Sequence, residues 1–368
     1  MLSDLKKAMW VSLMIIIVSG LLALFSASFQ NSRVTQEVFY NQLVFSILGV
    51  VAIFFLGRVD HRRYYDLAYI AYGINVFLLV AIFLFGYYAL GAKRWIEIFG
   101  FNFQPSEFMK LSLILALARY YTDHKPKVSF YNPWSRPAIV SDFFIPFAMT
   151  AAPAILIFKQ PDLGTAILLV GIFFVMAFAA GVSTKHLGGF LGVCLLAMPI
   201  LWHMMKPYQK DRLLVFLNPN VDPLGAGYTI IQSKIAIGSG QIFGKGWLSG
   251  TQNQLNFLPE RHTDFIFSVI GEEWGFVGSV IVVVCFYLLI LSGLRAVEQT
   301  KEKFSHLAGA GIVAIFALQV IINIGMVLGL CPIVGITLPF VSYGRSSFLV
   351  CILMFGFLLS LARQRKMF

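Results

Sequence analysis

The chain alternates long apolar segments with short polar loops over almost its whole length. Ten apolar segments can be distinguished, and each is expected to form a helix, because lipid offers no hydrogen-bond partner to an open backbone. A helix of about 20 residues crosses the hydrocarbon core of a membrane, so the pattern predicts an all-α polytopic membrane protein with about ten transmembrane helices. The fourth to sixth segments are short or interrupted by Pro and Gly, and they need not all cross completely. The segments lie near residues 8–29, 41–57, 64–85, 106–121, 141–158, 162–180, 185–204, 264–293, 305–329 and 339–361.

The composition agrees with this interpretation. Of the 368 residues, 58% are hydrophobic and 12% are charged, and the mean hydropathy is +0.80. The charged fraction is about half the ~25% of soluble domains, and a soluble domain of this size could not cover so much apolar surface. A soluble enzyme, a secreted disulfide scaffold, a disordered protein and a coiled coil are therefore excluded. The four cysteines lie in or beside apolar segments without the spacing of metal ligands, which predicts small core residues.

The formal net charge of +11 is distributed as a topological signal. If the N-terminus is cytoplasmic, sixteen Lys and Arg residues fall on the cytoplasmic side and four in the short loops opposite. Cytoplasmic loops carry an excess of Lys and Arg, so both termini are predicted to be cytoplasmic. The positive excess then faces anionic lipid, and no nucleic-acid partner is expected. The sixteen are Lys6, Lys7, Arg58, Arg62, Arg63, Arg119, Lys125, Lys127, Arg136, Lys185, Arg295, Lys301, Lys303, Arg363, Arg365 and Lys366; the four are Arg33, Lys93, Arg94 and Lys159.

One membrane domain, residues 1–368, is expected, with a long extracytoplasmic loop at 205–263 between the seventh and eighth segments. This loop is rich in Gly and Asn and carries charges of both signs. Inside it, the apolar residues of 228–237 (YTIIQSKIAI) are interleaved with polar ones, which predicts a short amphipathic helix on the membrane surface. A loop of this length is more often functional than passive.

Ionisable residues at membrane depth are costly, so they are candidates for function. Four polar stretches stand out, and the predicted topology puts all of them on the outer side. The first combines the sequences GAKRW and QPSE with Lys110, and Pro105 suits the first position of a helix. Glu107 and Lys110 share one helix face; they form either an internal ion pair or a polar wall of a substrate cavity. Trp95 by itself is typical of an interfacial anchor.

The second stretch is KQPDLGT, and the third is YQKDR. Asp162 in the second opens the next helix, either as its N-terminal cap or as part of a cavity lining. Lys210 and Arg212 in the third form a basic pair at the outer surface. Such a pair is either a phosphate-binding group or a solvated charge cluster near lipid headgroups.

The fourth stretch, LPERHTDFIF, passes from a charged run directly into an apolar helix. Asp264 starts that helix, either as a capping residue or as a carboxylate in a partly desolvated cavity mouth. In the latter case its pKa would be raised toward the range of a general base. A further charge, Arg345, lies at the outer start of the last segment, where it reaches the interface, pairs with a buried carboxylate or contacts substrate. On their own these features fit a transporter and a membrane-embedded enzyme equally.

Taken together, the polar stretches resemble the SEDS family (shape, elongation, division, sporulation), most closely its RodA branch. The matching segments occur in family order over most of the chain, and the region from GAGY to HTDFIF is specific to the family. They are GAKRW, QPSE followed by Lys110, QPDLGT, DPLGAGY (222–228), QSKIAIGSG (232–240), GKGWLSGTQ (244–252), LPERHTDFIF (258–267) and VSYG (341–344).

The resemblance implies a ten-helix fold and a peptidoglycan glycosyltransferase that polymerises lipid II at the outer face of the bacterial inner membrane, for cell-wall elongation and rod shape. It implies a class B penicillin-binding protein as partner, which supplies the transpeptidase. The essential aspartate of the family falls on Asp264. The cavity positions of the family fall on Trp95, Glu107, Lys110, Asp162 and Arg212. One departure is clear: the family usually has SYGG where this chain has SYGR, so Arg345 puts close backbone packing at that point in doubt.

The implied reaction joins the 4-hydroxyl of one lipid-linked disaccharide to the anomeric carbon of the growing chain, with polyprenyl pyrophosphate as the leaving group. The donor bond is α and the product bond is β-1,4, so a single inverting displacement suffices. Asp264 is the expected general base, and Lys110 and Arg212 are candidates for binding the pyrophosphate. Glu107 and Asp162 are expected to orient a lysine or to hold a divalent cation. Mg²⁺ or Mn²⁺ is compatible with one or two carboxylates, and no ligands are assigned to it.

The alternative function is a lipid II flippase. Two features weigh against it: the chain has no detectable inverted repeat, which is common in secondary transporters, and its ionisable residues cluster at the outer face rather than at the midplane. A scaffold that only recruits the transpeptidase is a third interpretation.

Overall fold

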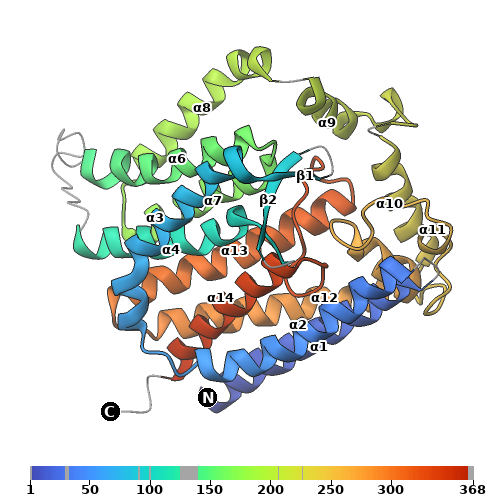
Figure 1. The fold of residues 1–368 in the computed structure, drawn as a ribbon, viewed down its shortest axis with the longest axis horizontal. Coiled ribbons are helices and arrows are strands. Elements are labelled where there is room, and N and C mark those ends of the chain that lie inside the picture. The colour runs from blue at the N-terminus through green and yellow to red at the C-terminus, as the bar shows by residue number, and fades with distance from the viewer. Residues whose placement is uncertain are drawn as a thin grey trace.

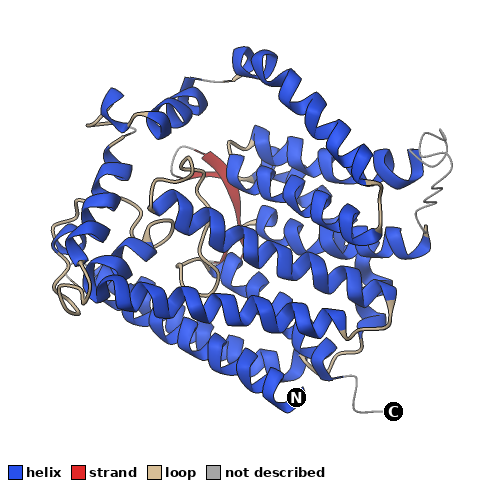
Figure 2. Cartoon of the chain, turned by 180° about the vertical axis from the view of Figure 1, so that it is seen from behind, coloured by secondary structure: helices blue, strands red, loops and turns tan. Residues whose placement is uncertain are grey.

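The computed structural model describes residues 2–29, 33–89, 92–98, 101–124, 140–205, 207–225 and 227–363. Several residues that the sequence patterns include lie outside this described part: Gly91, Lys125, Lys127, Arg136, Lys206, Ala226, Arg365 and Lys366. Within it, nearly all regular structure is helical (Figures 1 and 2), as predicted.

A long helix lies over each of the ten predicted apolar segments, one of them as two consecutive elements. In chain order these helices are α1 (Leu2–Ser28), α2 (Arg33–Leu56), α3 (His61–Phe85), α4 (Pro105–Asp123), the π-helix η1 (Val140–Phe144) running into α6 (Ile145–Lys159), α7 (Leu163–Ala180), α8 (Thr184–Met204), α12 (Ile266–Glu298), α13 (Lys303–Val327) and α14 (Arg345–Arg363).

Eight of these helical segments, among the described residues, are long and apolar enough to cross a membrane. The protein is thus a multi-pass membrane protein. Helices α4 and α8 are not among the eight, because α4 is more polar and α8 has only a short apolar stretch, Thr184–Leu196. The count of ten crossings and the orientation of the termini remain predictions. The start of α1 and the end of α14 lie at the same end of the molecule (Figures 1 and 2), as that orientation requires.

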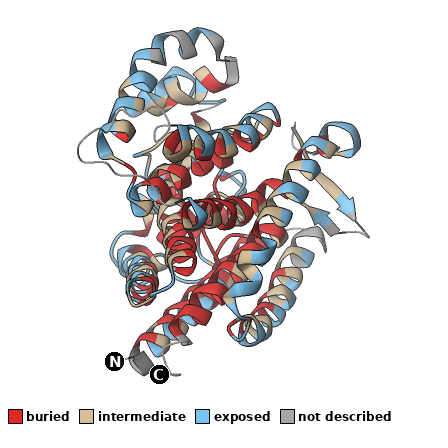
Figure 3. Ribbon diagram, turned by 90° about the vertical axis from the view of Figure 1, so that its left-hand side faces the viewer, coloured by how far each residue is buried: buried red, intermediate tan, exposed pale blue. Residues whose placement is uncertain are grey.

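Helices α13 and α14 form the centre of the molecule, and α2 and α3 lie at its periphery. Most side chains of α13 and α14 are buried, whereas α2 and α3 expose large apolar side chains such as Phe55 and Phe77. Buried residues accordingly concentrate in the middle of the bundle (Figure 3). Apolar side chains on the outside are expected where lipid is the solvent.

A small antiparallel sheet between α3 and α4 was not expected from the sequence. It consists of β1 (Tyr87–Ala89), β2 (Ala92–Ile98) and β3 (Phe101–Phe103), in the order β1-β2-β3. The expected polar stretch GAKRW is thus largely strand β2, in which Trp95 pairs with Tyr87. The sheet provides backbone pairing for a segment too polar to continue either helix.

The long loop contains α9 (Pro207–Leu217), a 3₁₀ turn η2 (Pro219–Val221), α10 (Tyr228–Gly240) and α11 (Thr251–Gln254). The predicted helix at 228–237 is present as α10, and its membrane-surface position remains a prediction. One face of α10 packs on α12: the hydroxyls of Ser233 and Ser268 are 2.9 Å apart, and Ser233 also donates to the carbonyl of Val327. The loop is therefore joined to the helical core rather than detached from it.

Helix α12 is interrupted at Gly275, whose φ of 66° is strained for any residue with a side chain. The amide groups of Phe276 and Val277 donate instead to the carbonyls of Gln241 and Ile242. A Cβ at position 275 would lie 2.3 Å from the amide nitrogen of Gly244. The kink thus lets the segment after α10 pack directly against the backbone of α12.

The contact between α10 and α12 yields a stability prediction. A Cβ at Gly240 would lie 2.0 Å from the carbonyl oxygen of Gly271, so Gly240→Ala must push the helices apart. We expect a loss of about 1–3 kcal/mol, measured as a lower midpoint of thermal unfolding in detergent. The matched control is Gly238→Ala on the same helix, where a Cβ meets nothing within 4 Å. It should be neutral or stabilising by up to about 1 kcal/mol; equal effects of the two variants would contradict the packing.

Candidate functional site

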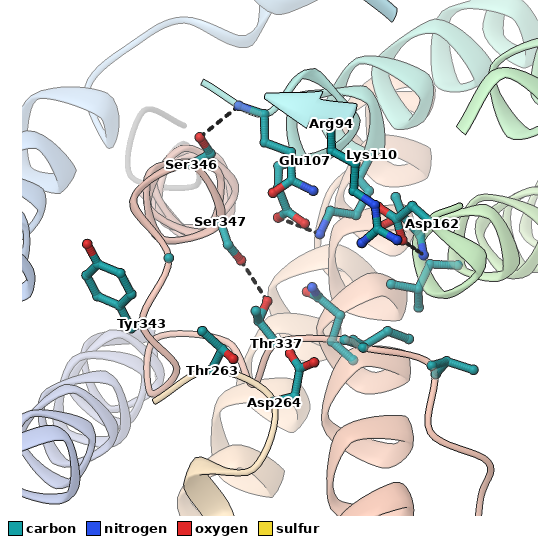
Figure 4. Close-up of a pocket in the computed structure, with 18 of the residues that line it drawn as sticks. Arg94, Glu107, Lys110, Asp162, Thr263, Asp264, Thr337, Tyr343, Ser346 and Ser347 are labelled. Atoms are coloured by element: carbon teal, nitrogen blue, oxygen red, sulfur yellow. Dashed lines mark hydrogen bonds and ion pairs between the residues drawn. The ribbon is translucent and has the colours of Figure 1, made fainter. Parts of the chain in front are cut away.

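A single cavity of about 590 Å³ gathers all six residues that the sequence points to. Its lining includes Trp95, Glu107, Lys110, Asp162, Arg212 and Asp264. They come from five separate parts of the chain: β2, α4, the start of α7, α9 and the segment before α12. Figure 4 shows how Glu107, Lys110, Asp162 and Asp264 converge on this space. Their roles stay predictions, but their proximity is now a structural fact.

Four helices begin at the cavity: α4, α7, α12 and α14. These are the fourth, sixth, eighth and tenth long helical segments, so their common starting side fits alternate crossing of a membrane. The N-terminus of a helix carries a partial positive charge and free backbone N–H groups. Four such ends around one cavity favour an anionic ligand, even though the lining also contains carboxylates.

The predicted ion pair on α4 is present. The ammonium group of Lys110 donates to Glu107 at 2.7 Å, and both side chains are buried. A buried charge is tolerated only when it is paired, so Glu107 holds the Lys110 ammonium in position at the cavity wall. The start of α4 at Pro105 also agrees with the sequence.

Asp162 has both of the roles left open for it. Its carboxylate caps α7 by accepting from the backbone amide of Thr165 at 3.1 Å. It also accepts from the hydroxyl of Ser106 at 3.4 Å and lines the cavity. The cap therefore fixes a buried negative charge at the cavity wall and links α7 to α4.

Arg94 is a cavity residue that the sequence reasoning did not single out, although it lies inside GAKRW. Its guanidinium donates to the carbonyl of Gln160 at 2.9 Å and to that of Pro161. These two carbonyls belong to the turn before α7. Strand β2 thus positions a cation beside Asp162 and supports the turn that carries it.

Asp264 does not cap α12, which corrects one of the two expectations for this residue. The helix begins at Ile266, and no side chain caps it. Within the described part of the chain, the Asp264 carboxylate makes no hydrogen bond or ion pair. Only its backbone carbonyl is bound, by the side-chain amide of Asn323 at 2.9 Å. The carboxylate is therefore available to a ligand in the cavity.

The surroundings of Asp264 raise its pKa to about 7. Burial is the largest cause, and the negative charges of Glu260 and Asp162 add to it, while Arg212 and Arg94 act in the opposite direction. The neighbouring His262 has a pKa lowered to about 4 by burial and by Arg261, so it is neutral near pH 7. Of these two groups, Asp264 is the one whose pKa suits proton transfer near neutral pH.

The segment before α14 holds the segment that carries Asp264. The Ser342 hydroxyl donates to the carbonyl of Thr263 at 2.6 Å and accepts from the amide of Leu338 at 2.8 Å. The amide of Tyr343 donates to the carbonyl of His262 at 2.9 Å. The sequences HTD and VSYG, about 80 residues apart, therefore form one hydrogen-bonded unit. Thr263, Asp264 and Tyr343 of this unit lie on the same side of the cavity in Figure 4.

Arg345, the departure noted in the sequence, is the first residue of α14 and lines the cavity. VSYG is bonded to the Asp264 segment in the presence of Arg345, so the backbone packing that the arginine put in doubt is present. Of the three alternatives for Arg345, pairing with a buried carboxylate is wrong for the described part of the chain, in which Arg345 forms no ion pair.

Two further lining or supporting residues, Gln319 and Asn323, were missed although the sequence held a signal for them. Both are buried polar residues in the apolar helix α13, four positions apart on one face. Polar residues at such depth are functional candidates.

The described residues contain no group of three or more His, Cys, Asp or Glu that could hold a metal ion.

Comparison with known proteins gives consistent results. The model of the FtsW/RodA/SpoVE family, described as cell cycle proteins, matches residues 6–367. The peptidoglycan glycosyltransferase MrdB of Escherichia coli K12 is 40% identical over 99% of this chain and 95% of its own. The peptidoglycan glycosyltransferase RodA of Treponema pallidum is 31% identical over 98% of each chain.

Solved structures match over the whole fold. One comes from work on the structural coordination of polymerization and crosslinking by a peptidoglycan synthase complex, with a TM-score of 0.81, 31% identity and 98% of each chain covered. Another is the crystal structure of the rod shape determining protein RodA of Thermus thermophilus, with a TM-score of 0.70, 29% identity, 97% of this chain and 96% of that chain covered.

The raised pKa of Asp264 predicts that this residue lowers the stability of the fold. Between its ordinary value of 3.8 and the folded value of about 7, folding takes up a proton, so stability falls as the pH rises. Above pH 7 the charged carboxylate is buried at full cost. We expect Asp264→Asn to raise the free energy of unfolding by about 1–3 kcal/mol at pH 8, and by less than half of that gain at pH 5. Thermal unfolding at both pH values measures this.

The control is Asp211→Asn, which removes an exposed carboxylate on α9. It should show no gain that depends on pH. An Asp264→Asn variant that is less stable than the parent at both pH values would contradict a destabilising effect of the buried Asp264 charge.

Proposed function

This chain belongs to the FtsW/RodA/SpoVE family, and we propose that its cavity is the site where it polymerises glycan strands. The protein is a peptidoglycan glycosyltransferase, the activity named for relatives that align over nearly the whole of both chains. It is also a multi-pass membrane protein. The finer points of substrate, mechanism, partner and orientation follow as proposals.

The proposed substrates are lipid II and the polyprenyl-linked growing strand. The 4-hydroxyl of one disaccharide attacks the anomeric carbon of the other, and polyprenyl diphosphate leaves. The α donor bond becomes a β-1,4 bond in one inverting displacement, so no covalent enzyme intermediate is required. The chemistry has two needs: a base for the attacking hydroxyl, and positive charge for the departing diphosphate.

The observation that carries the proposal is the Asp264 carboxylate, which faces the cavity with no hydrogen bond in the described part of the chain. A pKa of about 7 lets it accept the hydroxyl proton at neutral pH and release it afterwards. A positioned base supplies a factor of about 10²–10⁴. Positioning and charge stabilisation must supply the rest.

Positive charge for the diphosphate comes from three side chains and from the helix ends. Lys110 is held by Glu107, Arg94 by the turn before α7, and Arg212 by the carbonyl of Ile333 at 3.3 Å. These groups are fixed before substrate binds, so little reorganisation is needed as charge develops on the leaving group. Trp95 lies at the same wall and is proposed to contact the sugar or its lipid-linked end.

A divalent cation, Mg²⁺ or Mn²⁺, remains part of the proposal. Such ions keep several waters and need only one or two protein carboxylates. Of the two carboxylates considered for this ion in the sequence, Asp162 lines the cavity and Glu107 is paired with Lys110, so Asp162 is the proposed ligand and Asp264 stays available for proton transfer. When bound, the ion would offset diphosphate charge. The proton transfer to Asp264 does not depend on it.

The setting proposed for this reaction is the outer face of the bacterial inner membrane. There the polyprenyl tails stay in lipid while the headgroups enter the cavity beside the long loop. A class B penicillin-binding protein is proposed as the partner that cross-links the strands, because one structural neighbour belongs to a peptidoglycan synthase complex that coordinates polymerization and crosslinking. The likeness to MrdB and RodA favours a role in elongation and cell shape.

The test is polymerisation by the purified full chain, with and without its transpeptidase partner, on fluorescent lipid II with Mg²⁺ or Mn²⁺. We expect the parent to give a ladder of glycan strands. Asp264→Asn should lower the rate at least 10²-fold because the base is lost. Asp211→Asn, which removes an exposed carboxylate outside the cavity, should match the parent.

Both variants must keep the thermal stability and partner binding of a folded protein. An Asp264→Asn variant that polymerises normally would remove Asp264 as the base and leave Glu107 or Asp162 to be tested. If the parent forms no polymer under any of these conditions but moves lipid II across liposomes, the flippase is the correct function.

A further inference from the structure

Arg345 is a cation in the cavity that the described part of the chain leaves without a partner. It is the first residue of α14, and its side chain is half-buried. Its Nε is fully buried and has no hydrogen-bond acceptor. No described residue forms an ion pair or hydrogen bond with its guanidinium. The four carboxylates of the cavity lining therefore lie beyond ion-pair distance from it.

This situation differs from that of the other cations of the cavity. Lys110 is paired with Glu107, Arg94 donates to two carbonyls, and Arg212 donates to one. A buried donor without an acceptor is costly. Arginine cannot lose its proton to escape that cost. An unpaired guanidinium in a cavity is therefore explained best by an anion that arrives with the ligand.

The surroundings of Arg345 favour an anion as well. The first amide groups of α14 are free of the helix ladder, which begins with the bond from Phe348 to the carbonyl of Gly344 at 2.8 Å. Ser346 and Ser347 also line the cavity, but their hydroxyls are already bonded: that of Ser346 donates to the carbonyl of Asn102 at 3.2 Å, and that of Ser347 bonds to the hydroxyl of Thr337 at 2.9 Å (Figure 4). A guanidinium beside the free amide groups of a helix N-terminus offers donors that phosphate oxygens accept.

We propose that Arg345 binds the diphosphate of the lipid-linked substrate directly, as a specificity residue that this chain has in place of the glycine usual in its family. The inference rests on the proposed function, because that function supplies the diphosphate. Arg345 would hold the group from the α14 side, across the cavity from Lys110 and Asp162. It would then make the affinity for diphosphate higher in this chain than in relatives with glycine.

The test measures binding of a polyprenyl diphosphate to the full chain in nanodiscs of fixed lipid composition. Arg345→Gln removes the charge, and Arg345→Gly restores the family residue. We expect both to weaken binding about tenfold or more, since a charge-assisted hydrogen bond is lost. Arg345→Lys should recover part of the affinity. The matched control is Arg295→Gln, which removes an exposed arginine near the opposite end of α12 and should leave binding unchanged.

Further arms separate the sources of the anion. If Arg345→Gln leaves binding of polyprenyl diphosphate intact but weakens binding of lipid II, which also carries a peptide, Arg345 binds a peptide carboxylate and the proposal is wrong. The proposal is likewise wrong if Arg345→Gln no longer weakens polyprenyl diphosphate binding once anionic lipid is removed from the nanodisc, because Arg345 then binds lipid headgroups. Unchanged binding in all three Arg345 variants would overturn it outright.

The polymerase assay measures KM and kcat for lipid II in the parent and in Arg345→Gln. Arg345→Gln should raise KM for lipid II more than it lowers kcat, at unchanged thermal stability. If the parent does not polymerise at all, the proposed function fails while the binding measurement still decides the role of Arg345. If the parent polymerises and Arg345→Gln has the same KM, only the inference about Arg345 fails.

Discussion

The side-chain amide of Asn323 is the constraint on which the cavity depends. This residue is fully buried in α13, and its one amide nitrogen donates to the carbonyls of Asp264 at 2.9 Å and Ile336 at 2.7 Å. Those carbonyls belong to the two irregular segments that precede α12 and α14. Irregular backbone inside a membrane protein persists only where protein groups satisfy it. Asn323 thus fixes the two segments to the central helix and, through them, the position of the Asp264 carboxylate.

The chemistry of the site follows from this anchoring. Because the backbone around Asp264 is bound by Asn323, Ser342 and Tyr343, its carboxylate can stay in a desolvated position without bonds of its own. Burial and neighbouring carboxylates then raise its pKa, while fixed cations and four helix ends keep the cavity suited to an anionic substrate. The fold accepts an unfavourable charge at one point, as is common where a group must react.

Much of this arrangement could be predicted from the sequence because it is local. Hydrophobic runs located the long helices, spacing along a helix predicted the pair of Glu107 and Lys110, and Asp162 before a helical run predicted its cap. The candidate site residues also proved to share one cavity. The resemblance to a known family contributed their selection; composition and periodicity alone left transporter and enzyme open.

The rest depends on contacts between distant segments, which a single sequence does not display. The bond from Tyr343 to His262 and the role of Asn323 required the fold. The small sheet was missed because its strands are three to seven residues long and partly polar. The sequence left Asp264 as either a helix cap or a carboxylate in the cavity mouth, and only the structure, in which α12 begins two residues later, rules out the cap. Its carboxylate therefore stays unbonded within the described part of the chain, as the role of a base requires.

The pH dependence of kcat/KM for lipid II tests whether Asp264 acts as a general base with a raised pKa. We predict that kcat/KM rises about tenfold per pH unit below pH 7 and levels off above it. Glu260→Gln removes a charge that raises the pKa of Asp264, so the rising part of the kcat/KM profile should shift to lower pH. A profile that is flat between pH 5 and 8, or one that Glu260→Gln leaves unmoved, would contradict this role of Asp264.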